Sequence, residues 1–318
     1  MMRLEVRELT AVYDTALGEL KAVDDVTLKV YEKETIGVAG ESGCGKSTLA
    51  LAMLRLLKPP GRIKKGKILY DGENILEKRD EEIRQIRMKK VSFIPQSSMN
   101  ALNPVLRIKD QFKDMMVAHG EDRNNVEKKI EETLSMVELK PYVMNFFPHE
   151  LSGGMKQRVV IGMALILNPE ILIADEPTTA LDVVVQREIL ELLRHIKEKL
   201  GKTVILISHD MAVQAEITDR IAIMYAGKIV EMGDTMDIFK QPLHPYTELL
   251  ISSIPVIGRK MRLKGIPGFP PDLRKLPKGC RFMPRCPKAM RGTCDEIEPS
   301  LIPIEKRREV ACFLYEGR

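Results

Sequence analysis

Gly40-Glu41-Ser42-Gly43-Cys44-Gly45-Lys46-Ser47-Thr48 is the stretch that decides the fold of this chain. It has the spacing of a phosphate-binding loop, in which a glycine and four further residues precede Gly-Lys-Ser. The apolar run Thr35–Ala39 before it predicts a buried strand, and Leu49–Leu54 after it predicts a helix, a context that argues against a chance glycine turn. We expect Lys46 to meet the β- and γ-phosphates of a nucleotide and Ser47 to help hold Mg²⁺.

The composition limits the class of protein. The chain has 318 residues, enough for one large domain and an appendage, and a formal net charge of +5. This mild charge neither requires nucleic acid nor excludes an anionic surface. No apolar run is long enough to span a bilayer, and Met1–Val6 has no apolar signal segment, so we expect a cytosolic chain.

Two further apolar runs each end in polar side chains. Asp175 and Glu176 follow the apolar run Ile171–Ala174, and His209 comes shortly after Thr203–Ile207. Ligands of doubly wound sheets bind at the C-terminal ends of the strands, so these side chains are candidates for a metal ligand and for a group that acts on water. A surface Asp-Glu pair fits the apolar run poorly, whereas a lone histidine at such a place is more often structural.

Three other segments bear on the fold or on ligand binding. Ser152, Gly153 and Gly154 precede a predicted helix from Lys156 to about Leu167 and form a second candidate anion site. The pattern from Val105 to about Val137 is helical. Tyr13 is expected in a loop, where its ring could stack on a purine or serve as a plain core residue.

The composition changes after about Asp234, where prolines become frequent. Four of the five cysteines lie in this tail, at Cys280, Cys286, Cys294 and Cys312. Clustered cysteines in a cytosolic protein favour metal ligation over disulfides. Four thiolates suit either a tetrahedral zinc or a 4Fe-4S cluster, while disulfides and free thiols stay open.

Taken in order, these motifs resemble the ATP-binding-cassette ATPases over about residues 1–235. The resemblance implies an α/β fold: a P-loop NTPase cassette with a mixed sheet core, a helical subdomain at about residues 97–167, and a small loop-rich tail at residues 236–318. One departure is Met155, which stands where the family usually has Gln. Because the backbone N–H groups and Ser152 are retained, we expect function to survive this change.

The resemblance also assigns roles. Tyr13 would stack on adenine, Glu176 would polarise the attacking water, and His209 would contact the γ-phosphate, with Lys46 completing the catalytic set. The remaining ATP-binding residues would be Gly40, Ser42, Gly43, Cys44, Gly45, Lys46, Ser47, Thr48 and Gln96. The Mg²⁺ ligands would be Ser47, Gln96 and Asp175. Since the family works as head-to-tail pairs, the ATP of the opposite subunit would be completed by Ser152, Gly153, Gly154 and Asp182.

Two short motifs narrow the subclass. Asn100-Ala101-Leu102-Asn103-Pro104 and His244-Pro245-Tyr246-Thr247 resemble segments of the ATPase subunits of oligopeptide and dipeptide importers. The resemblance implies a second, related ATPase subunit, two integral membrane permease subunits, an extracytoplasmic solute-binding protein, and a peripheral place on the cytoplasmic face of the cell membrane. It also favours a 4Fe-4S cluster on the four cysteines, with Zn²⁺ as the alternative.

The rival hypothesis is a soluble ATPase of the same family that acts on nucleic acid or ribosomes. Such a protein usually has two cassettes or long coiled coils, and this sequence has neither. The tail is basic at Arg281, Arg285 and Lys288 but also carries Asp295 and Glu296. We therefore expect an importer ATPase and no nucleic-acid partner.

Overall fold

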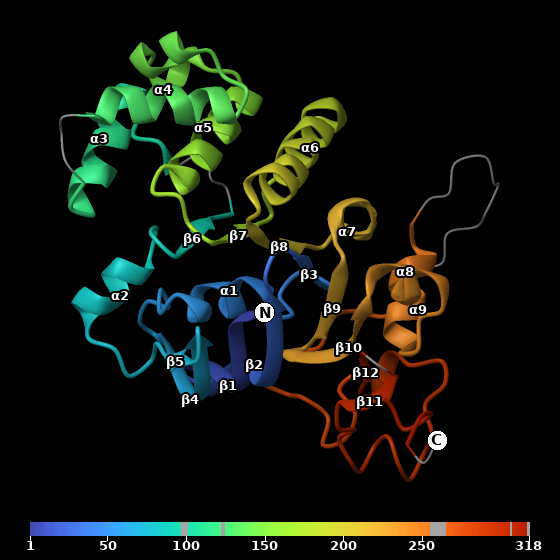
Figure 1. Cartoon of the computed structure of the whole chain (residues 1–318). Helices are drawn as coiled ribbons and strands as arrows, with labels where there is room; N and C mark the ends of the chain where they lie inside the picture. Colours follow the sequence, from blue (N-terminus) through green and yellow to red (C-terminus); the bar gives the residue numbers. More distant parts are fainter. Residues whose placement is uncertain (97–100, 122–124, 255–264, 306, 317–318) are drawn as a thin grey trace. The chain divides into compact units, whose positions relative to one another are not determined.

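The computed structural model describes residues 1–96, 101–121, 125–254, 265–305 and 307–316. The chain divides into two compact units, one formed by residues 1–76 and 206–318 and the other by residues 77–205. Figure 1 shows the secondary-structure elements of both. The predicted domain limits near residues 97, 167 and 235 stay predictions, since compactness groups the tail with the first strands.

The first unit contains most of the strands. Its elements are β1 (Met2–Thr15), β2 (Gly18–Tyr31), β3 (Thr35–Ala39), α1 (Lys46–Met53), β4 (Gly61–Tyr70), β5 (Glu73–Asn74), α7 (Met211–Ile217), β9 (Arg220–Tyr225), β10 (Lys228–Asp234), α8 (Thr235–Lys240), α9 (Pro245–Ser252), β11 (Ile302–Glu305) and β12 (Arg308–Val310). The strand β8 (Thr203–Ser208) crosses from the second unit into the first.

An antiparallel sheet with the strand order β2-β1-β4-β5 includes Tyr13, which was expected in a loop. That expectation was wrong. Tyr13 lies within β1 and pairs with Leu20 of β2 and with Gly61 of β4. The register shifts on either side of Ala11 interrupt the apolar alternation, which is why the pattern after Leu9 no longer indicated a strand.

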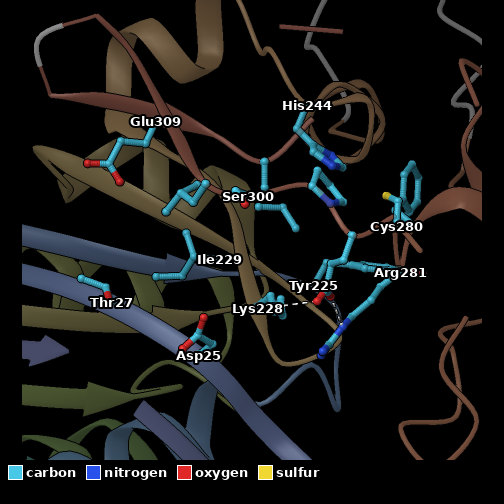
Figure 2. Close-up of a pocket in the computed structure, with 16 residues that line it drawn as sticks. Asp25, Thr27, Tyr225, Lys228, Ile229, His244, Cys280, Arg281, Ser300 and Glu309 are labelled. Atoms are coloured by element: carbon cyan, nitrogen blue, oxygen red, sulfur yellow. Dashed lines mark hydrogen bonds and ion pairs between the residues drawn. The ribbon is translucent and has the colours of Figure 1, made fainter. Parts of the chain in front are cut away.

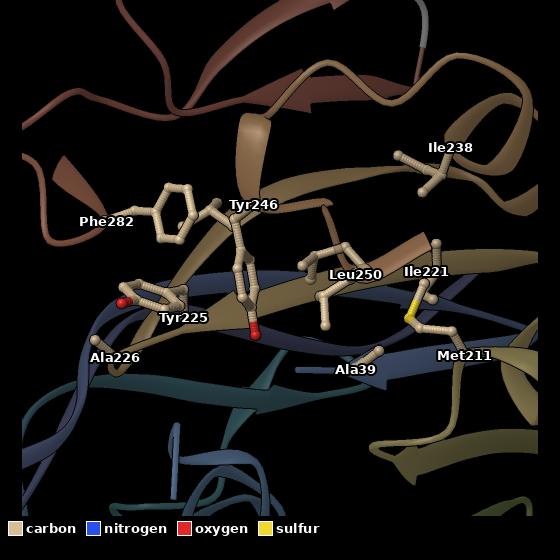
Figure 3. Close-up of a cluster of buried hydrophobic side chains, with 11 residues drawn as sticks. Ala39, Met211, Ile221, Tyr225, Ala226, Ile238, Tyr246, Leu250 and Phe282 are labelled. Carbon is tan, nitrogen blue, oxygen red and sulfur yellow. The ribbon is translucent and has the colours of Figure 1, made fainter. Parts of the chain in front are cut away.

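A second sheet of the same unit contains neighbouring strands in the order β11-β12-β10-β9-β3. β3 and β9 are parallel and buried throughout, whereas β9, β10, β12 and β11 form antiparallel pairs. The tail therefore extends the sheet of the phosphate loop through β12. A buried cluster joins Tyr225 of β9 to Tyr246 and Leu250 of α9 and to Phe282, so the tail shares a core with the strands (Figure 3).

The second unit is largely helical. Its elements are α2 (Asp80–Ile86), β6 (Val91–Ile94), α3 (Ile108–Ala118), α4 (Val126–Met136), α5 (Gly153–Leu165), β7 (Ile171–Asp175) and α6 (Val183–Leu200). β6 and β7 are parallel neighbours. The helical pattern predicted from Val105 to Val137 corresponds to α3 and α4, where Ile108, Phe112 and Ile130 are fully buried.

Within the described residues, no helix combines the length and apolar character that crossing a bilayer requires.

Candidate functional site

The phosphate loop connects β3 to α1, and its backbone requires glycine at two positions. Gly45, which caps α1, has a φ of 108°, and a Cβ there would lie 2.0 Å from the carbonyl oxygen of Ala22. Gly40 has a φ of 151°, and a Cβ there would lie 2.2 Å from the carbonyl oxygen of Met224. Neither place has room for a side chain, so these glycines are a steric requirement of the loop.

Lys46 is the first residue of α1 and is only 7% exposed. Its ammonium donates hydrogen bonds to the carbonyl oxygens of Gly40, at 2.7 Å, and Glu41, at 3.0 Å. The loop thus holds a cation at a helix N-terminus, where free N–H groups and the helix dipole also favour negative charge. This arrangement is suited to a polyphosphate.

Two other predicted residues belong to the same unit. The hydroxyl of Tyr13 lies 3.2 Å from Oγ1 of Thr48, so the structure brings this tyrosine to the phosphate loop. His209 is exposed and directly follows β8. Asp210 next to it caps α7 by accepting hydrogen bonds from the N–H groups of Ala212 and Val213. The position of His209 is therefore set by a strand end and a capped helix start.

Sequence reasoning missed the way in which the tail contacts the loop. The N–H of Glu41 donates to the hydroxyl of Tyr246, at 2.9 Å, and the Glu41 carboxylate pairs with Arg285. The His-Pro-Tyr motif was the signal that could have indicated this contact, but its sequence gives no hint of which loop it meets.

The local role of that motif is clear from its hydrogen bonds. His244 caps α9: its Nδ1 accepts from the N–H of Tyr246 at 3.0 Å. The N–H groups of Leu243 and His244 donate to the buried carboxylate of Glu231, each at 2.9 Å. Burial lowers the pKa of His244 to about 3, which keeps Nδ1 free of a proton and able to accept.

The paired carboxylates lie in the second unit, at the end of β7. Asp175 is the last residue of this fully buried strand and is itself 2% exposed. Glu176 follows with a φ of 52°, a left-handed conformation, and lies just beyond the end of the strand. Its Oε2 accepts a hydrogen bond from Oγ1 of Thr179 at 3.1 Å. Asp175 is thus buried, whereas Glu176 is half-buried and has more access to water.

The Leu-Ser-Gly-Gly segment and Asp182 also lie in this unit, at two helix starts. Ser152 caps α5, where its Oγ accepts from the N–H of Met155 at 3.3 Å. Asp182 caps α6 by accepting from the N–H groups of Val184 and Val185, both at 3.0 Å. A Cβ at Gly154 would lie 2.7 Å from Cγ1 of Val185, so this glycine lets the two helix starts pack together.

Gln96 is exposed and follows β6. Of the segment Asn100–Pro104 that narrowed the subclass, Asn100 lies outside the described residues. Asn103 is held by the buried side chain of Gln111, which donates to its carbonyl oxygen and accepts from its N–H. Hydrogen bonds with the α3 side chain therefore hold this part of the segment, which precedes the helix, in place.

The four tail cysteines line one small cavity of about 20 Å³. A Cβ at Gly279 would lie 2.4 Å from the carbonyl oxygen of Cys294, so glycine is needed for Cys280 to come this close. The N–H of Cys280 donates to that same oxygen at 2.7 Å. The four cysteines therefore lie around one cavity, and the metal ligation expected of them stays a prediction.

The thiols are not placed as a finished metal site. Burial is the largest cause that raises the pKa of Cys280, to about 11, and burial also raises the pKa values of Cys286 and Cys312. In the part of the chain that the structure describes, no group of three or more His, Cys, Asp or Glu side chains has an arrangement that would hold a metal ion. The donor chemistry fits a thiolate-bound metal, but binding would have to displace protons and adjust the side chains.

A larger cavity of about 560 Å³ lies in the first unit, between β2, the β9–β10 hairpin and the tail (Figure 2). Its cations are already neutralised by the protein. Lys228 and Arg281 both pair with Glu298, at 2.9 and 2.8 Å, and Arg281 also pairs with Asp24. This cavity therefore offers no unbalanced positive charge to a phosphate, in contrast to the loop at Lys46.

Two family models match the chain. The model described as "ABC transporter" matches residues 23–179, and the model described as "Oligopeptide/dipeptide transporter, C-terminal region" matches residues 230–294. The dipeptide transport ATP-binding protein DppD of Caldanaerobacter subterraneus is 45% identical, over 98% of this chain and 97% of its own length. DppD of Bacillus subtilis is 42% identical over 99% of this chain and 95% of its own. The oligopeptide transport ATP-binding protein OppD of Escherichia coli is 40% identical over 98% and 92%.

Solved structures agree with these sequence matches. The dimeric, post-hydrolysis ATP-binding cassette MJ0796, bound to ADP and Pi, superimposes with a TM-score of 0.65 and 30% identity, covering 73% of this chain and 98% of that one. The structure of cbiO1 from Clostridium perfringens, part of the ABC transporter complex cbiONQ, superimposes with a TM-score of 0.64 and 26% identity, covering 76% of this chain and 91% of that one.

Proposed function

The chain belongs to the ATP-binding-cassette transporters, among the ATP-binding proteins of dipeptide and oligopeptide transport, and we propose that it drives peptide import by hydrolysing ATP. The family and the P-loop cassette fold predicted from the sequence are confirmed. The observation that carries the function is the buried Lys46 at the glycine loop, in a chain that matches peptide-transport ATPases along almost its whole length. The alternative of a nucleic-acid or ribosome ATPase is disfavoured by the match of the tail.

We propose these roles for the residues of the nucleotide site. Tyr13 stacks on adenine, and Lys46 with the loop amides binds the phosphates. Ser47, Gln96 and Asp175 would hold Mg²⁺, which would balance phosphate charge. Glu176 polarises the water for in-line attack on the γ-phosphate, and His209 contacts that phosphate. The chemistry is positioning and charge stabilisation, with no covalent intermediate.

The second ATP-contacting set acts across a pair of cassettes. We propose that the pair is head-to-tail, so that Ser152, Gly153, Gly154 and Asp182 complete the site of the opposite subunit. The solved cassette MJ0796 is a dimer in its ADP- and Pi-bound state, which supports pairing as a mode of action. ATP would favour the closed pair and hydrolysis the open one, a two-state switch biased by ligand.

The assembly follows from the same family. We propose a second, related ATPase subunit, two integral membrane permease subunits and an extracytoplasmic solute-binding protein as partners, with this chain peripheral on the cytoplasmic face of the cell membrane. The segment Ala101–Pro104, fixed on α3 by Gln111, would face a permease subunit.

The four cysteines carry a second proposal. The residues Cys280, Cys286, Cys294 and Cys312 would hold a 4Fe-4S cluster, with Zn²⁺ as the alternative. The convergence of the four thiols on one cavity supports the proposal, although the arrangement as it stands is not a ready metal site. A metal there would supply a structural cross-link between segments that otherwise have little regular structure.

Purification tests the function. The tagged chain is isolated from detergent-treated membranes, and the copurifying molecules are identified. A second ATPase with two small membrane proteins, and ATP hydrolysis that a peptide-loaded binding protein stimulates in vesicles, would support the peptide importer. Copurifying RNA without membrane proteins would contradict it.

Metal analysis after anaerobic purification tests the tail. The cluster would be supported by about four irons with sulfide per chain and by a broad absorption band at ~400 nm. One zinc per chain and no iron would support Zn²⁺ in place of the 4Fe-4S cluster. A protein free of metal contradicts both.

A further inference from the structure

Glu41 is an acidic side chain within a loop that binds polyphosphate. It directly follows Gly40, and its own carbonyl oxygen accepts one of the hydrogen bonds that hold the Lys46 ammonium. An uncompensated carboxylate at this place would repel the phosphates and attract Lys46. The loop therefore needs something to neutralise Glu41 and to hold it away.

Arg285 meets this need from the tail. Its two terminal nitrogens donate to the two oxygens of Glu41, Nη1 to Oε2 at 2.6 Å and Nη2 to Oε1 at 2.9 Å. The side chains are only 6% and 22% exposed, so water screens the pair far less than it would a surface pair. A paired fork of this kind fixes both charge and direction. The carboxylate also raises the pKa of Arg285, which stays a cation at every accessible pH.

Two hydrogen bonds besides those to Glu41 hold the Arg285 side chain in place. Its Nε donates to the carbonyl oxygen of Pro267 at 2.7 Å, and its Nη1 donates to the hydroxyl of Tyr225 at 3.3 Å. The backbone of Glu41 has a second anchor, because its N–H donates to the hydroxyl of Tyr246. Tyr225 and Tyr246 pack against each other with ring centroids 4.6 Å apart (Figure 3).

We propose that Arg285 positions the phosphate loop for ATP by neutralising Glu41 and holding its carboxylate away from Lys46. The inference rests on the proposed ATPase function and adds a tail residue to the binding of the nucleotide. Arg285 would not touch ATP and acts through Glu41. The tail would thereby tune ATP affinity.

A purely structural role for Arg285 makes a different prediction. If the pair only anchors the tail, removing either partner weakens the protein, and removing both gives no recovery. If Arg285 neutralises a harmful charge, the loss of the arginine is corrected by also removing the charge of Glu41. A double-mutant cycle separates these cases, because the double variant binds ATP as weakly as Arg285→Ala in the first case and recovers its ATP affinity in the second.

The test measures binding of a fluorescent ATP analogue to the full-length chain, together with KM and kcat for ATP. We expect Arg285→Ala to weaken binding about tenfold, equivalent to ~1.4 kcal/mol, with KM raised and kcat at saturating ATP retained. Glu41→Gln should bind at least as tightly as the parent. The double variant should return to within about threefold of Glu41→Gln. Arg285→Lys should fall between the parent and Arg285→Ala, since it keeps the charge but loses the fork.

Lys288→Ala is the matched control. Lys288 lies in the same tail close to Cys286 and pairs with Glu248, but both side chains are 50% exposed. This variant should bind ATP like the parent. The proposal is overturned if Arg285→Ala binds ATP as the parent does, or if the double variant is as weak as Arg285→Ala. If the parent chain binds and hydrolyses ATP in either of these cases, the proposed function stands although the role of Arg285 does not. A parent chain that fails to bind ATP overturns both.

Discussion

Lys46 donates a hydrogen bond to the carbonyl oxygen of Gly40 over 2.7 Å, so the cation of the phosphate loop is held by the loop itself. At 7% exposure its charge has little access to water. We expect phosphate oxygens to replace these carbonyl groups as partners of the ammonium when a nucleotide binds. The loop is thus prepared for an anion before one binds, which lowers the cost of binding.

Lys46→Ala should abolish most nucleotide binding. The change removes the cation at the helix start while the glycines that shape the loop remain. We expect affinity for ATP to fall at least tenfold, which corresponds to ~1.4 kcal/mol or more, as measured by isothermal titration calorimetry. Lys58→Ala, a change at an exposed lysine, is the control and should bind normally. Equal affinity of the two variants would refute the assignment of the loop.

Glu176→Gln should separate binding from turnover. The amide keeps the size of the side chain but cannot polarise water as a carboxylate does. We expect ATP affinity to be kept, ATP hydrolysis to fall by about 10²-fold or more, and a closed pair to accumulate with ATP on size-exclusion chromatography. Hydrolysis at the parent rate would show that another residue activates the water.

The fold was predictable wherever a short motif fixes its own neighbourhood. The Gly-x-x-x-x-Gly-Lys-Ser loop follows β3 and starts α1 as its spacing required, and the Ile171–Ala174 run forms most of β7. The place of Tyr13 was not predictable, because bulges in β1 interrupt the alternation on which strand prediction depends. Local patterns determine local structure, while a bulge is decided by the paired strands.

The contacts of the tail were hidden for a different reason. Arg285 and Glu41 are 244 residues apart, and nothing in either local sequence identifies the other as a partner. The tail also supplies β12 to the sheet through only three residues, Arg308–Val310, too few for a periodic signal. Long-range ion pairs and short edge strands follow from tertiary packing, so they cannot be predicted from the local patterns of a single sequence.

Substitutions of Asp182 should distinguish its structural and functional roles. Its carboxylate caps α6 through Oδ1, and the proposed second role is at the ATP of the opposite subunit. Asp182→Asn keeps a capping oxygen but removes the charge. Asp182→Ala removes both and should cost about 1 kcal/mol of stability. We expect both variants to lose ATPase activity and only Asp182→Ala to lower the midpoint of urea unfolding. Full activity of Asp182→Asn would leave the residue as a cap alone.

His244 should make the protein less stable in mild acid. Burial lowers its pKa from 6.5 to about 3, so between these values the unfolded chain binds the extra proton and stability falls as the pH falls. From pH 7.5 to pH 5.5 the expected loss is ~1.4 kcal/mol, measured by urea unfolding. The neighbouring Glu231 carboxylate, paired with Arg308, has a pKa that burial raises and so acts in the opposite direction. His244→Asn keeps a cap acceptor without a titrating ring, and this control should lack the acid-dependent loss. The same pH dependence in both proteins would assign the effect to other groups.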